Sequence, residues 1–96
     1  MPAYKAVYSQ TSYALIRALH PRIKAIIKNR IEEILENPYL GKALERDLAG
    51  YYSFRAKRYR IIYKIEDASR TIEIHYAGHR KDIYERFKEL IGNMGG

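Results

Sequence analysis

The chain has 96 residues, enough for one domain (residues 1–96) with a single modest core, and 47% hydrophobic residues are too many for a disordered chain. It lacks cysteine, a signal-peptide h-region and any apolar run near the roughly 20 residues of a membrane-spanning helix, which predicts a soluble, cytoplasmic protein without disulfides. A net charge of +7 favours an anionic partner: nucleic acid, an anionic membrane face or an acidic protein.

The N-terminal part of the chain predicts one strand and two helices. Residues 3–8 carry β-favouring side chains, typical of a first strand at a sheet edge. Ser9 can cap a short helix that continues to about His20, with apolar residues at three-residue steps. Between residues 22 and 37, isoleucines fall on one helical face and charged residues on the other. We expect a helix hairpin whose apolar faces pack on a sheet.

Three later segments alternate between apolar and polar residues: 51–57, 59–66 and 70–77. The short connections between them predict an antiparallel meander. In the third segment, we expect Tyr76 to share a face with Ile72 and Ile74.

The remaining segments connect or end these elements. Residues 38–50 show no clear period, and Leu40, Leu44 and Leu48 are the expected apolar anchors there. Residues 80–91 predict a final helix, and residues 92–96 a frayed tail. The order β-α-α-β-β-β-α predicts an α+β fold, an antiparallel sheet with an N-terminal helix pair on one face.

The charge is concentrated in residues 53–64, which contain no acid and five cations: Arg55, Lys57, Arg58, Arg60 and Lys64. Arg55 and Arg60 belong to the polar sets of two adjacent predicted strands, so both can share one sheet face. Guanidinium groups bind phosphate oxygens through a planar fork of donors. The stretch therefore indicates a phosphate or nucleic-acid surface; a merely solvated face or an acidic protein partner are the alternatives.

A second candidate region, residues 78–84, lies where the last strand meets the last helix. It offers the imidazole of His79, the guanidinium of Arg80 and the phenol of Tyr84. Imidazole transfers protons near neutral pH, and arginine stabilises a pentavalent phosphate. If both residues are helical, Arg80 and Tyr84 share a face. The alternative is a plain helix start, with Tyr84 in the core and Arg80 on the surface.

Other titratable residues carry weaker signals. His75 is expected to be half-buried, with Glu73 as a possible partner, and His20 to end a helix. Glu45 and Asp47 can serve as a base or lie solvated in the connection. No His, Asp or Glu spacing indicates a metal site, and no glycine loop indicates a nucleotide, so we expect no cofactor.

Two segments together resemble a known family: residues 48–67, which contain the run Tyr-Arg-Ile-Ile-Tyr, and the run Gly-His-Arg-Lys-Asp-Ile-Tyr. They are similar to the RelE/ParE superfamily of toxin–antitoxin toxins, and specifically to its RelE branch. The resemblance implies a microbial-ribonuclease-like domain that cleaves mRNA in the ribosomal A site without a metal. The 2′-hydroxyl attacks the adjacent phosphate, leaving a cyclic phosphate and a 5′-hydroxyl. It also implies a RelB-like acidic antitoxin that wraps the basic surface in a hetero-oligomer.

The resemblance also implies roles for single residues. Arg60 matches the arginine that binds the scissile phosphate, and Arg80 the arginine that stabilises the transition state. Tyr84 and His79 match positions for substrate activation and proton transfer. The expected RNA contacts are Arg55, Lys57, Arg58, Lys64 and Lys81.

The sequence departs from the RelE pattern at two points. Ser53 stands where some members carry a lysine proposed as a general base, and the interval from Arg80 to Tyr84 is shorter than in the best-known members. Other relatives use a glutamate–histidine pair. Three alternatives therefore stay open: a ParE-like DNA gyrase inhibitor, a non-catalytic RNA-binding module, and an inactive relic.

Overall fold

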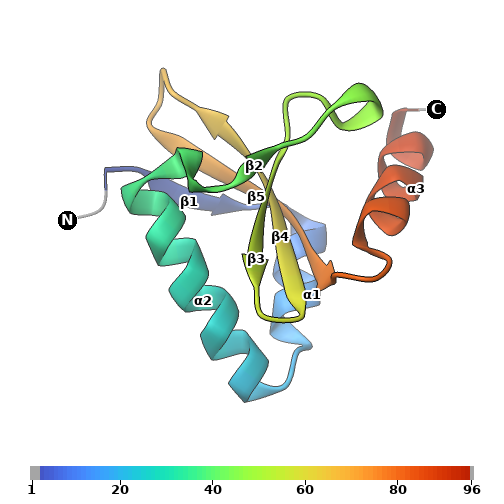
Figure 1. Ribbon diagram of the computed structural model, residues 1–96, viewed down its shortest axis with the longest axis horizontal. Coiled ribbons are helices and arrows are strands. Elements are labelled where there is room, and N and C mark those ends of the chain that lie inside the picture. The colour runs from blue at the N-terminus through green and yellow to red at the C-terminus, as the bar shows by residue number, and fades with distance from the viewer. Residues whose placement is uncertain (1–2, 96) are drawn as a thin grey trace.

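The computed structural model describes residues 3–95 as one five-stranded sheet with helices on both faces (Figure 1). The helices are α1 (Gln10–Arg17), α2 (Pro21–Glu36) and α3 (Ile83–Gly95), and two short 3-10 turns are η1 (Pro38–Leu40) and η2 (Arg46–Leu48). The strands are β1 (Lys5–Tyr8), β2 (Lys42–Ala43), β3 (Tyr52–Ala56), β4 (Tyr59–Glu66) and β5 (Thr71–His79). The predicted α+β class is confirmed.

The strand order across the sheet is β1-β5-β4-β3-β2. Strands β3, β4 and β5 form the predicted antiparallel meander, but β1 pairs with β5 in parallel, so the prediction of a purely antiparallel sheet is wrong. No tight turn joins β1 to its neighbour, so the sequence pattern leaves the direction of β1 undetermined. Strand β2 was missed because two residues are too few to show alternation.

The face of the sheet under α1 and α2, here the helix-pair face, holds the larger core. Helix α2 begins at Pro21, and the Nδ1 atom of His20 accepts a hydrogen bond from the Arg22 N–H at 3.1 Å, which caps the helix. Its isoleucines pack on the strands, and the main buried members of this core are Ile27, Ile31, Ile34, Ile61, Tyr63, Ile72 and Ile74. The predicted helix hairpin on a sheet is confirmed.

The opposite face, here the α3 face, holds a smaller core in which Ile83 and Phe87 of α3 pack with Ile62 and Leu48 (Figure 1). Of the three predicted leucine anchors, Leu48 is buried, Leu44 packs at the edge of this core, and Leu40 is exposed. The prediction that Leu40 is an apolar anchor is therefore wrong. Leu40 belongs to η1, in which Pro38 is the buried residue.

Helix α3 differs at both ends from the predicted helix over residues 80–91. Strand β5 continues to His79 and residues 80–82 form a turn, so the helix starts at Ile83. It continues to Gly95, beyond the predicted end at residue 91, while the fraying of residues 92–95 stays a prediction; residue 96 lies outside the described part. Leu90 and Ile91, which pack on the second core, explain why the last turns stay helical.

A β-bulge at His75 changes the faces of strand β5. Ile62 pairs with Tyr76 and Tyr63 with Ile74, so His75 is an extra residue without a partner on β4. As a result Tyr76 packs on the α3 face, and the prediction that it shares a face with Ile74 is wrong.

The bulge is held by the start of α1. The Ser12 hydroxyl donates to the Ile74 carbonyl at 2.7 Å, and the Ser9 hydroxyl donates to the His75 carbonyl at 3.2 Å. These bonds tie the backbone of the bulge to the start of α1.

Within residues 3–95, no helix is long and apolar enough to cross a bilayer.

Candidate active site

Six cationic residues gather at one end of the sheet, where the β3–β4 turn lies beside the turn from β5 to α3. This basic tip consists of Arg55, Lys57, Arg58, Arg60, Arg80 and Lys81. The Arg80 N–H donates to the Arg58 carbonyl at 2.8 Å, which holds the two turns together. Lys57 has a positive φ of 60° and closes the β3–β4 turn without a glycine. In Figure 1 these turns form the lower end of the sheet, next to the start of α3.

Arg55 and Arg60 share one face of the sheet, as the alternation predicted, and the register places them directly opposite each other across β3 and β4. Like charges at opposite positions of a sheet are destabilising, so this pairing favours an anion between or above the two groups. The Arg55 Nε–H donates to the Lys57 carbonyl at 3.1 Å, which orients the exposed guanidinium at the turn.

Acidic side chains do not neutralise the basic tip within the described residues. Three ion pairs occur among the described residues. They join Arg30 to Glu33, His75 to Glu73 and Arg86 to Asp82, and none of them includes a cation of the basic tip. Asp82 is close to the tip in sequence, and the hydrogen bond from Arg86 at 2.8 Å holds the pKa of its carboxyl below the usual range. The tip is therefore a concentrated positive surface suited to phosphate groups.

The most specific polar arrangement lies beside the tip and joins Ser53, Arg60 and Tyr84, here the Ser53 cluster. Ser53 is only 1% exposed, and its Oγ accepts hydrogen bonds from Arg60 Nη1 at 3.2 Å and from the Tyr84 hydroxyl at 3.1 Å. The three residues come from β3, β4 and α3. The Tyr84 ring packs at the second core while its hydroxyl reaches the cluster, and its role in catalysis stays a prediction.

Arg80 lies in the turn before α3 and is exposed. The expected shared helical face with Tyr84 is therefore wrong, because α3 begins only at Ile83. The backbone bond from Arg80 to Arg58 instead places Arg80 at the edge of the basic tip.

His79 lies on the helix-pair face of the sheet, whereas Arg60 lies on the α3 face. It pairs with Tyr59 across β4 and β5, and the two rings meet edge to face with centroids 5.6 Å apart. Its Nδ1 accepts from the Lys81 N–H at 3.3 Å. The structure thus brings Arg60 and Tyr84 together and separates His79 from them by the sheet.

Lys64 lies away from the tip, farther along β4. Its Nζ sits 4.7 Å from the centroid of the Tyr51 ring and its backbone pairs with Glu73. Glu73 also contacts His75 Nε2 at 3.1 Å, which confirms the predicted partnership. Glu45 and Asp47 are exposed beside η2. Among the described residues, no group of three or more His, Asp or Glu side chains can hold a metal ion.

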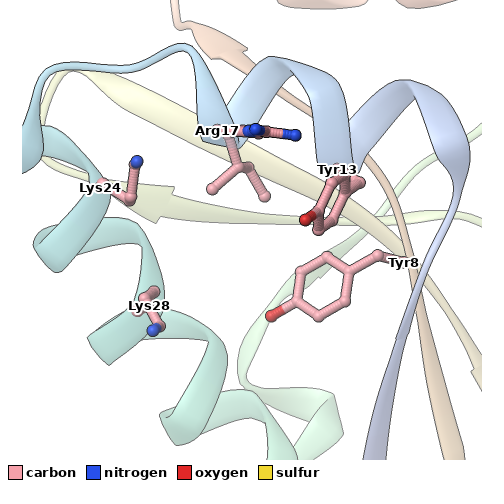
Figure 2. A pocket seen from close by; sticks show the side chains of 6 residues that line it. Tyr8, Tyr13, Arg17, Lys24 and Lys28 are labelled. Atoms are coloured by element: carbon pink, nitrogen blue, oxygen red, sulfur yellow. The ribbon is translucent and has the colours of Figure 1, made fainter.

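A second basic surface lies on the other side of the molecule, in a cavity of about 490 Å³ between α1 and α2. It is lined by Tyr8, Tyr13, Ile16, Arg17, Lys24 and Lys28. Figure 2 shows Tyr8 and Tyr13 together on one side, with Lys24 and Lys28 on the α2 side. Val7 on the edge strand β1 and Tyr13 on α1 are both more than half exposed. Sequence reasoning missed this surface because its residues come from three separate elements.

Comparison with known proteins identifies the relatives of this chain. Residues 7–88 match a family model described as the ParE-like toxin of type II bacterial toxin-antitoxin systems. The toxin RelG of Mycobacterium tuberculosis is 35% identical over 85 residues, which cover 86% of this chain and 98% of RelG. The toxin RelE of the same organism is 31% identical over 84 residues, covering 86% of this chain and 87% of that protein.

The fold has the same relatives. The crystal structure of the toxin-antitoxin complex RelBE2 from Mycobacterium tuberculosis contains a chain that superposes with a TM-score of 0.74 at 33% identity. The match covers 83% of this chain and 100% of that one.

Proposed function

The chain belongs to the ParE-like toxin family of type II toxin-antitoxin systems, and from this premise we propose that it is a RelE-like mRNA endoribonuclease. The observation that carries the proposal is the Ser53 cluster, which fixes a half-buried arginine and a tyrosine hydroxyl beside a phosphate-binding surface. A surface that only bound an anion would not require this buried arrangement.

In the proposed reaction, Arg60 binds the scissile phosphate and Arg80 adds charge from the edge of the tip. The RNA 2′-oxygen attacks the adjacent phosphorus and loses its proton to water. The bond from phosphorus to the 5′-oxygen breaks, and Tyr84 donates its phenolic proton to that oxygen. The products are a 2′,3′-cyclic phosphate and a 5′-hydroxyl. Guanidinium groups aimed at the developing charge replace a metal ion in this scheme.

The proton donor is assigned to Tyr84 over His79. Tyr84 is linked to Arg60 through one serine oxygen, whereas His79 packs on Tyr59 on the other face of the sheet.

The RNA strand is held by the remaining cations of the basic tip: Arg55, Lys57, Arg58 and Lys81. Lys64 is left out of this group, because its ammonium lies over the Tyr51 ring. The substrate class is mRNA on the ribosome, following the RelE branch that the sequence resembles.

An antitoxin is the proposed partner, since this chain is similar to a chain of the RelBE2 toxin-antitoxin complex, and the net charge of +7 favours an acidic one. The cavity between α1 and α2 supports this partner, because it joins Arg17, Lys24 and Lys28 to the exposed rings of Tyr8 and Tyr13. Such a surface suits a segment that carries acidic residues along one side and apolar residues along the other.

The test is inducible expression of the chain, with mRNA integrity followed in cells and in translating extracts. We expect growth arrest with mRNA cleavage for the unchanged chain and for Arg22→Ala, an exposed cation on α2 outside both basic surfaces. Arg60→Ala is expected to abolish both effects. Growth arrest with intact mRNA would refute the ribonuclease.

A ParE-like gyrase inhibitor is the second candidate, favoured by the description of the matching family model. It predicts a DNA-damage response with no loss of mRNA in the same experiment. RNA binding that depends on Arg60 but gives no cleavage product would indicate a non-catalytic module, and harmless expression an inactive relic.

A further inference from the structure

We propose that Ser53 is a positioning residue that holds Arg60 and Tyr84 in their reactive orientation; this inference rests on the proposed ribonuclease function. Ser53 does not touch the substrate in this scheme, because its side chain is buried beneath the other two. It acts through the two hydrogen bonds that its Oγ accepts.

The geometry uses the full acceptor capacity of one hydroxyl group. A serine oxygen has two lone pairs and one hydrogen. Arg60 Nη1 takes one lone pair at 3.2 Å and the Tyr84 hydroxyl takes the other at 3.1 Å. The two groups that act on the phosphate are therefore tied to the same atom, and neither can rotate away without breaking a bond inside the protein.

The support beneath Ser53 is rigid. Ser53 is the second residue of β3, and its backbone pairs with Ile62 of β4 on one side and with Lys42 of β2 on the other. Its Cα is thus fixed by two neighbouring strands, and Tyr84 reaches it from α3 through a ring packed at the second core. Catalytic groups placed on regular elements are held more precisely than groups on loops.

Ser53 also fits both states of Tyr84 in the proposed reaction. Before the transfer, the Tyr84 O–H turns from Ser53 toward the 5′-oxygen, and the Ser53 hydroxyl turns to donate its own hydrogen to the tyrosine oxygen. Arg60 Nη1 keeps its bond to Oγ. No proton leaves Ser53 in this step; only the direction of one hydrogen bond reverses.

The test compares three substitutions of Ser53 in the purified full chain, using translating ribosomes and mRNA. Ser53→Ala removes the oxygen, Ser53→Cys keeps nearly the same shape with a weak acceptor, and Ser53→Thr keeps the hydroxyl. Because sub-ångström misplacement of a reacting group is costly, we expect kcat to fall roughly 10- to 100-fold for Ala and Cys. KM is expected to stay within about twofold, since the other cations of the basic tip still bind the RNA strand. Thr is expected to retain most of the activity.

A role in packing alone predicts the opposite order, because Cys fills the site and Thr overfills it. Full activity of the Cys variant together with loss in the Thr variant would therefore overturn the proposal. Thermal unfolding of each variant identifies any that fails to fold.

A double-substitution cycle provides the second measurement. If Ser53 acts partly through Tyr84, then Ser53→Ala lowers kcat by a smaller factor in the Tyr84→Phe background than it does alone, and the loss that remains is the part that passes through Arg60. Losses that multiply in full in the double variant would contradict a positioning role toward Tyr84.

A third measurement does not depend on activity. Proton NMR of the free chain follows hydrogen exchange of the Arg60 guanidinium, assigned with Arg60→Lys. Slow exchange is expected in the unchanged chain and in Ser53→Thr, and fast exchange in the Ala and Cys variants. If the chain cleaves no RNA, the ribonuclease proposal fails, while this exchange pattern still decides whether Ser53 holds Arg60. Equal exchange in all four proteins would refute the positioning role.

Discussion

Strand β4 presents two different surfaces in consecutive residues. On the helix-pair face, Ile61 and Tyr63 are fully buried against α2. On the α3 face, Arg60 is half-buried beside Ser53, and only Ile62 enters a core. The difference shows how a 96-residue chain separates stability from reactivity: one side of the same strand holds the domain together and the other side carries charge.

The α3 face can carry charge because α3 buries only a small core on it. The core of Leu48, Ile62, Ile83 and Phe87 is small, and the end of the sheet beyond it stays open for the basic tip. Substitutions on the two faces are therefore expected to affect different measurements.

Arg60→Ala should have the largest effect, and on activity alone. Loss of one donor to a developing oxyanion lowers kcat by about 10²- to 10³-fold, and here the loss includes a charge. The measurement is the rate of mRNA cleavage in a translating extract, with the melting temperature as control. The unfolding temperature is expected to stay within about 5 °C, because removing one of two facing cations offsets the lost bond to Ser53. A much larger loss of stability would mean that the α3 face also holds the fold.

Ile61→Ala is the matched change on the neighbouring residue and the other face. Ile61 is fully buried, so we expect the free energy of unfolding to fall by about 3 kcal/mol. For a domain of this size that lowers the melting temperature by roughly 12–24 °C. Cleavage by the folded fraction, measured well below the transition, should be unchanged. An active-site defect in fully folded protein would contradict the separation of the two faces.

Tyr63→Phe tests the polar link at the edge of the helix-pair core. The Tyr63 hydroxyl donates to the Pro38 carbonyl at 2.6 Å and accepts from the Gly41 N–H at 3.2 Å, so its loss leaves buried groups unpaired. The expected cost is about 2 kcal/mol in urea unfolding, with no change in cleavage. A cost below about 0.5 kcal/mol would mean that water replaces the hydroxyl.

The shifted pKa of Tyr63 also predicts a pH dependence of folding stability. Burial raises the pKa of Tyr63 from its ordinary value of 10.0 to about 12. The folded state therefore favours the neutral phenol of Tyr63. The stability that results is fully present below pH 10 and is lost as the pH rises from 10 to about 12. The difference in stability between the unchanged chain and the Phe variant should narrow over that interval.

Arg55→Ala should have the smallest effect, on binding at the basic tip. Each phosphate contact to a single strand contributes about 0.7 to the slope of log affinity against log salt concentration, so this slope should fall by roughly that amount. Affinity for RNA with a 2′-deoxy cleavage site is the suitable measurement, and Arg22→Ala is the matched control with no expected change. An unchanged slope would remove Arg55 from the RNA surface.

The predictable part of the molecule is the part with regular periodicity. Alternation in residues 51–66 correctly assigned the faces of β3 and β4, including the opposed Arg55 and Arg60. Helix period and the proline at position 21 located α2. These features depend on local sequence, so one chain is sufficient to predict them.

The rest depends on contacts between distant elements. Ser53 and Tyr84 are 31 residues apart, and their bond follows from how α3 docks on the sheet, which no local pattern encodes. The position of His79 follows from the bulge at His75, because one extra residue reverses the alternation after it. The direction of β1 and the two-residue strand β2 are likewise set by tertiary pairing.

The bulge at His75 gives β5 a place where the chain can lose one residue. Because His75 has no partner on β4, deleting it would leave Tyr76 opposite Ile62 and His79 opposite Tyr59, on the faces that they occupy now. Deleting a paired residue such as Gly78 would instead bring His79 opposite Arg60, on the α3 face. The effect of a one-residue deletion in this strand therefore depends on whether the deleted residue is paired.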